Sequence, residues 1–198
     1  MILSDSEMNK FEFRGDSFPL RCDLLVLEKI QDKVGDIMDA ENEIRGFKPR
    51  VDSDGVVDTT VGRWTIPNIS LVTQSLVWMM EEAREITNGQ YQIPTTKDLK
   101  QQDDYTIAEL ATIVYREFSS CIAGKKKEEN QSKEEDGYRD SSKKCLIDFS
   151  WLIFVGLQCR LSRTEIQREP FWRMQELVQQ WKRQQNAVTK QCVWNIDE

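Results

Sequence analysis

The sequence predicts a mainly α-helical protein with a small β component, an α+β fold. Apolar residues recur at helical spacing through most of the chain, and apolar and polar residues alternate around one Gly-Asp pair near the N-terminus. A charged segment that is poor in apolar residues divides the chain. The 198 residues are 39% hydrophobic and 31% charged. These values are typical of a globular protein that can bury a core.

The alternating stretch runs from Phe11 to Arg21 and predicts a short β-hairpin around Gly15-Asp16. The tripeptide Arg14-Gly15-Asp16 matches an integrin-binding motif. Because no secretion signal precedes it, we interpret the tripeptide as a turn between two strands.

Helical signals follow the hairpin. Asp23 is expected to cap a helix that runs to about Ile44 and ends at Gly46. Residues 47–66 contain Pro and Gly between Val pairs and predict a loop or a second small hairpin. Two long helices and one short helical turn are expected after this segment. Their start and stop signals are Pro67-Asn68, Asn88-Gly89, Thr95 or Thr96, the Thr106–Glu109 capping box and Gly124.

Residues 124–144 are predicted to be a flexible charged linker. Tyr138 is its only sizeable apolar group, so burial cannot offset the entropy of ordering it. The expected organisation is therefore a helical N-terminal domain with a small hairpin at 1–123, a disordered linker at 124–144 and a C-terminal helical domain at 145–198.

The C-terminal domain is predicted to contain helices only. Residues 146–157 are apolar on nearly every side, so we expect a buried helix. Ser162–Glu165 forms a capping box, and Pro170 should break or kink the helix that starts there. Apolar residues at helical spacing continue over 171–181, and the chain is expected to fray from about Ala187.

Charge and cysteine content exclude several classes of protein. The net charge is −7, and residues 1–123 alone hold 13 Lys and Arg against 22 Asp and Glu, so nucleic acid is not an expected partner. Five cysteines lack the Cys-x-x-Cys spacing of metal and redox sites. The N-terminus does not resemble a signal peptide, and the longest apolar stretch, of 12 residues, is too short to span a bilayer. We expect a soluble, cytoplasmic protein that binds no membrane.

The residues that usually carry catalysis are missing. The chain has no histidine, so it lacks the commonest general base and metal ligand. Glycines form no phosphate-binding loop. The paired carboxylates are expected on solvated faces, and residues 52–63 match a calcium loop only in part, because Arg63 replaces the final Glu. No catalytic residue, metal or cofactor is predicted, and the expected function is protein binding.

Large side chains crowd the C-terminal part. They can pack its helices together, or some can form an exposed patch, since Trp and Phe are enriched among binding anchors. Both interpretations stay open, because a segment this small cannot bury every large side chain. The candidate partner-binding residues are Phe149, Trp151, Phe171, Trp172, Met174 and Trp181.

Three C-terminal motifs resemble those of phage tail assembly chaperones: residues 147–157 (Ile-Asp-Phe-Ser-Trp-Leu-Ile-Phe-Val-Gly-Leu), 161–166 (Leu-Ser-Arg-Thr-Glu-Ile) and 171–174 (Phe-Trp-Arg-Met). The first part is similar to the shorter form of these proteins from phages and prophages of Gram-positive bacteria. That similarity lies in residues 13–15, 20–24, 27–30, 76–82 and 117–121. One departure is Ala83, where members often have Gly.

The resemblance implies a tail assembly chaperone. The N-terminal domain would coat the tape measure protein, and the C-terminal extension would recruit major tail tube subunits in the host cytoplasm without joining the mature virion. Long members arise by ribosomal frameshift, and Lys125–Lys127 or Lys143-Lys144 could be encoded by slippery runs. A nucleotide sequence without a slippery heptamer would contradict that hypothesis. Homo-oligomer formation and a general adaptor or regulatory role stay open as alternatives.

Overall fold

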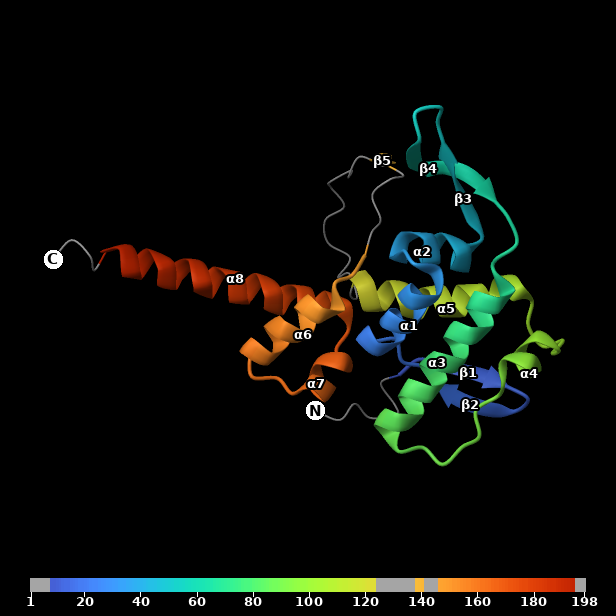
Figure 1. Ribbon diagram of the computed structural model, residues 1–198. Coiled ribbons are helices and arrows are strands. Elements are labelled where there is room, and N and C mark those ends of the chain that lie inside the picture. The colour runs from blue at the N-terminus through green and yellow to red at the C-terminus, as the bar shows by residue number, and fades with distance from the viewer. Residues whose placement is uncertain (1–7, 124–137, 141–145, 195–198) are drawn as a thin grey trace, which may run out of the picture.

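A computed structural model describes residues 8–123, 138–140 and 146–194. The fold is mainly helical with a small β part, as the sequence predicts (Figure 1). Its elements are, in chain order, β1 (Lys10–Phe13), β2 (Asp16–Pro19), α1 (Leu24–Val34), α2 (Ile37–Arg45), β3 (Phe47–Val51), β4 (Val56–Trp64), α3 (Ile69–Thr87), α4 (Thr96–Lys100), α5 (Ile107–Ala123), β5 (Tyr138–Asp140), α6 (Phe149–Gln158), α7 (Arg163–Gln167) and α8 (Phe171–Trp194).

The N-terminal hairpin is confirmed. β1 and β2 pair antiparallel with Phe11 opposite Phe18, and the loop between the strands is Arg14-Gly15. Both loop residues have positive φ, 51° and 87°, which is the backbone that tight two-residue hairpins require. The Arg-Gly-Asp tripeptide thus spans a β-turn.

The helix expected from Asp23 to Ile44 is two helices. Gly35 adopts a left-handed φ of 89° and ends α1, and the Asp36 side chain accepts hydrogen bonds from the first amides of α2. A Gly followed by Asp is a helix stop next to a helix start, and this pair overrides the apolar periodicity that runs across it. The predicted cap at Asp23 and stop at Gly46 are both confirmed.

Residues 47–64 form the second hairpin that the sequence left as one of two options. β3 pairs antiparallel with β4, with an irregularity between Pro49 and Arg50, and β4 also pairs with β5. β5 lies inside the segment predicted to be a linker, because backbone pairing does not need apolar side chains. β5 is the only part of the predicted linker that the structure describes. Residues 124–137 and 141–144 lie outside the described residues.

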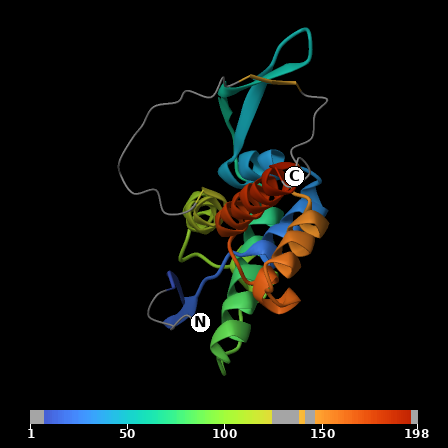
Figure 2. The ribbon, with the colours of Figure 1, turned by 90° about the vertical axis from the view of Figure 1, so that its left-hand side faces the viewer.

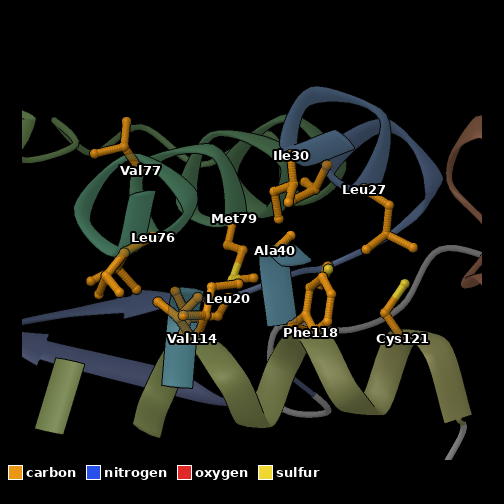
Figure 3. Packing of buried hydrophobic residues seen from close by; sticks show 14 of the residues in the cluster. Leu20, Leu27, Ile30, Ala40, Leu76, Val77, Met79, Val114, Phe118 and Cys121 are labelled. Atoms are coloured by element: carbon orange, nitrogen blue, oxygen red, sulfur yellow. The ribbon is translucent and has the colours of Figure 1, made fainter. Parts of the chain in front are cut away.

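The main core lies between α1 and α3 on one side and α5 on the other (Figure 3). From α5, Val114, Phe118 and Cys121 point toward the other two helices. α3 supplies Leu76 and Met79, both fully buried. The predicted cap signals are confirmed around these helices: Asn88 ends α3, Thr95 caps α4 and Thr106 forms a capping box with Glu109.

The C-terminal helices, which are α6, α7 and α8, pack against the rest of the molecule. α8 lies on α5 and α7 lies on α1, and one apolar cluster includes Ile147, Leu152 and Met174 together with the main core. Ser162 caps α7, and Pro170 separates α7 from α8, as predicted. Beyond this contact α8 extends away from the body (Figures 1 and 2). It continues as a helix to Trp194, past the point where fraying was expected.

Within the described residues, no helix is long and apolar enough to cross a membrane.

Candidate partner-binding surface

Aromatic side chains from α6 and α8 meet in one place at the surface, where those of α6 are exposed and that of α8 is half-buried. The Trp151 and Phe154 rings stack with centroids 5.5 Å apart, and the Trp181 ring lies edge-on to both, at 5.7 and 6.3 Å. Trp151 is 38% exposed, Phe154 45% and Leu157 51%. We call Trp151, Phe154, Leu157 and Trp181 the aromatic patch. Large apolar groups held together on a surface mark protein-binding sites more often than scattered ones do.

The patch exists because α6 is apolar on more sides than its surroundings can cover. The Asp148 carboxylate accepts a hydrogen bond from the Trp151 amide and starts the helix. Leu152, Val155 and Gly156 face the neighbouring helices and are buried. The sequence predicted burial all round, and that prediction is wrong for the opposite face. α7 and α8 are the helices that pack closely on α6, so they leave its outer face in solvent.

Gly156 sets how closely α7 approaches α6. A Cβ atom at this position would lie 2.5 Å from Ile166 Cγ1 and 2.6 Å from Ile166 Cδ1. Real Cβ atoms do not approach that closely, so Gly is the residue that lets the buried Ile166 side chain fill this space. The close packing holds the scaffold under the patch, which fixes the position of Trp151 and Phe154 on the next turns.

The structure separates the predicted binding residues into three groups. Trp151 and Trp181 meet in the aromatic patch. Phe149, Phe171 and Trp172 are half-buried and do not stack with the patch. Met174 is fully buried, so this part of the prediction needs correction: Met174 faces the core because it lies on the inner side of α8, where it packs near Gly156.

Phe154 and Leu157 were not among the predicted residues, although both are exposed. The interpretation of 146–157 as a fully buried helix hid them. One turn of helix separates Trp151, Phe154 and Leu157, and this spacing was the available signal.

A second exposed apolar group lies at the base of the β3–β4 hairpin, and the sequence analysis missed it. Trp64 is 66% exposed and Ile66 is 75% exposed. The Phe47 ring tilts against Trp64 with centroids 5.1 Å apart, and the Arg45 guanidinium lies 5.3 Å from the centre of the Trp64 ring. An isolated Trp in a polar, Gly-containing stretch was the available signal. We call Phe47, Trp64 and Ile66 the hairpin base.

Buried acidic groups lie under the C-terminal helices. Burial, followed by the charge of Glu82, raises the pKa of Asp23 to about 8. Burial and the charge of Glu85 raise the pKa of Glu82. The Asp23 carboxylate also caps α1 by accepting hydrogen bonds from Leu25 and Val26. Both carboxyls are almost completely covered, so solvent does not reach them in the folded chain.

Among the described residues, no group of three or more Cys, Asp or Glu side chains is arranged to hold a metal ion. Cys22, Cys121 and Cys159 are free thiols, and the first two are buried.

Comparison of the chain with known protein families, with curated proteins and with solved structures found no match.

Proposed function

We propose that this protein is a non-enzymatic binding protein, a tail assembly chaperone that binds the tape measure protein and recruits tail tube subunits in the host cytoplasm. The observation that carries the binding role is the aromatic patch. Three aromatic rings are in mutual contact on a folded helical scaffold, and two of them, Trp151 and Phe154, are exposed while Trp181 is half-buried. The resemblance to tail assembly chaperones supplies the partners.

The patch suits a helical partner. A tape measure protein is a long helix whose apolar stripes stay exposed until the tail tube closes around it. Trp and Phe side chains bury large areas at low entropic cost when their positions are already fixed. Stacking holds Trp151 and Phe154 in place before binding, so a partner residue that packs against the outer faces of the rings does not need to order them.

Charge adds a preference for basic segments. The first 123 residues have a net charge of −9, whereas residues 145–198 have +1. An acidic body next to an apolar contact speeds encounter with basic partners and disfavours acidic ones. This preference should weaken at high salt, because screening reduces long-range attraction.

Co-expression with the tape measure protein of the same phage tests the proposal. The full chain should keep the tape measure protein soluble, and the variant Trp151→Ser with Phe154→Ser should lose most of that effect. Trp64→Ser is the matched control, because it removes an exposed Trp at the hairpin base. Loss with the Trp64 variant and none with the patch variant would contradict the proposed site. No solubility gain with any form would contradict the chaperone assignment.

Recruitment of tube subunits is a separate step with its own test. The full chain mixed with soluble tail tube protein should form a complex that migrates as one species in size-exclusion chromatography. A general adaptor would bind neither tape measure nor tube protein. A gene order without a neighbouring tape measure gene would favour that alternative.

A further inference from the structure

The C-terminal helices α6, α7 and α8 pack against the front of the molecule, by which we mean residues 8–123. We call this contact the seam, and it has polar contacts at its edges. Gln31 of α1 donates a hydrogen bond to the Ile147 carbonyl at 3.1 Å and accepts one from the Ile147 amide at 2.8 Å. Arg21 donates to the Arg168 carbonyl at 2.9 Å, and the Leu24 amide donates to the Glu169 carbonyl at 3.1 Å. All four of these bonds therefore involve backbone groups of a segment that is far away in sequence.

The apolar part of the seam has the form of a helix lying on a helical surface. The inner side of α8 presents Phe171, Met174, Leu177 and Val178, which pack against the cluster that contains Phe118 and Cys121 of α5. This spacing is that of an amphipathic helix with one apolar stripe. The surface of α5 thus already accepts one amphipathic helix, α8.

The seam also covers groups that a permanently closed core would not favour. Asp23 and Glu82 are both buried there, and the Arg168 guanidinium reaches Glu82 at 3.9 Å. Arg21 Nε is buried without a hydrogen-bond partner in the part of the chain that the structure describes, and the Asp23 and Glu82 carboxyls are buried next to each other. An unpaired buried donor and two adjacent buried carboxyls cost free energy, which exposure to water would recover. This cost lowers the difference in free energy between the closed seam and an open one.

We propose that the α5 surface beneath α8, together with the adjoining start of α1, is a second binding surface, for an amphipathic helix of a partner protein, and that α8 occupies it as a reversible intramolecular substitute. The occupant's chemistry follows from α8 itself: an apolar stripe at i, i+3, i+6 and i+7, with backbone carbonyls near its start that meet Arg21 and Leu24. This surface is distinct from the aromatic patch, and the proposal does not depend on the identity of the partner.

A peptide in trans tests the proposal on the full chain. A fluorescein-labelled peptide of residues 146–185 should bind the Met174→Ala chain about tenfold more tightly than the unaltered chain, by fluorescence anisotropy. The reason is that the substitution weakens the internal occupant while the peptide keeps Met174. Gln175→Ala, which changes an exposed residue on the next position of α8, is the matched control and should bind like the unaltered chain.

Peptide variants identify which face binds. A peptide with Met174→Asp should lose binding, whereas a peptide with Trp181→Ser should keep it, because Trp181 belongs to the aromatic patch. The opposite pattern would assign the interaction to the patch and overturn the proposal. The proposal would also be overturned if the unaltered, Met174→Ala and Gln175→Ala chains all bound the unaltered peptide equally, or if none of them bound it.

Hydrogen exchange of the same chains separates opening from unfolding. In Met174→Ala, amides of α6 and α7 should exchange at least tenfold faster while those of α3 keep their protection. If α3 loses protection as well, the milder Leu177→Ala chain replaces it, since Leu177 is half-buried at the same seam. Equal acceleration in α3 and α6 with that chain too would show that the seam opens only on global unfolding, which would overturn the proposal.

Discussion

α6 is more apolar than α3, yet it is less buried. α6 has no charged residue, yet its buried positions are Leu152, Val155 and Gly156 alone. α3 carries charges in its second half, yet it buries a continuous face and even the Glu82 carboxyl. The difference lies in their neighbours: α3 is packed by α1, α5, α4 and β2, whereas α6 is packed by α7 and α8. An apolar helix at the edge of a fold keeps an exposed apolar face, which is then available to a partner.

The largest expected effect comes from removing a buried side chain of α3, compared with removing an exposed one of α6. Leu76→Ala removes a fully buried side chain from α3 and should lower the free energy of unfolding by about 2 to 5 kcal/mol. Leu157→Ala removes the same atoms from the exposed face of α6 and should change it by less than about 0.5 kcal/mol. Urea unfolding of both variants measures the difference. Equal losses would show that α6 is buried in solution, against the exposed patch.

The next effect concerns the packing of α7 on α6. Gly156→Ala improves helix propensity by about 1 kcal/mol, but its Cβ would lie 2.5 Å from Ile166. Because overpacking costs about 1 to 3 kcal/mol, we expect the free energy of unfolding to fall by about 1 kcal/mol, as measured by thermal unfolding. Ser150→Ala, at an exposed position of the same helix, is the control and should not destabilise. A stabilised Gly156 variant would contradict the close approach of α7.

The third effect is a pH dependence that arises in α1 and α3. The pKa of Asp23 is raised to about 8 in the folded chain, and the usual aspartate value is 3.8. The folded state therefore holds a proton that the unfolded state has released, so stability should fall as pH rises from about 4 to about 8. The raised pKa values of Glu82 and Glu117 act in the same direction.

Asp23→Asn should flatten this slope, because Asn can still cap α1 and carries no charge. Asp148→Asn makes the same change at the exposed cap of α6 and serves as the control. The measurement is the urea midpoint at several pH values between 4 and 8. A slope that Asp23→Asn leaves unchanged would show that the proton resides elsewhere.

Local signals in the sequence predicted most of the element boundaries. Short-range physics sets them: Asp23 and Thr106 side chains satisfy free amides at helix starts, and Gly46 adopts positive φ at a helix end. The break at Gly35 was also local, but the apolar periodicity on both sides concealed it.

Burial was not predictable in the same way, because it depends on contacts between distant parts of the chain. Phe154 lies on the more apolar helix, α6, and is exposed, whereas Met174 lies on the more polar α8 and is buried. The seam between Gln31 and Ile147 joins residues 116 positions apart, which no local pattern encodes. Half of the candidate site, Trp151 and Trp181, was therefore identified by residue type, and Phe154 and Leu157 only by the structure.

The smallest expected effect on stability belongs to the aromatic patch, and it tests the central claim most directly. The affinity of the purified full chain for a tape measure segment should be measured with and without Trp151→Ser and Phe154→Ser, together with the melting temperature of each preparation. We predict that the melting temperature changes by no more than about 4 °C, which is about 1 kcal/mol for a chain of this size, while affinity falls at least tenfold. Unchanged affinity in a variant that remains folded would contradict the claim that the exposed face of α6 is a binding site.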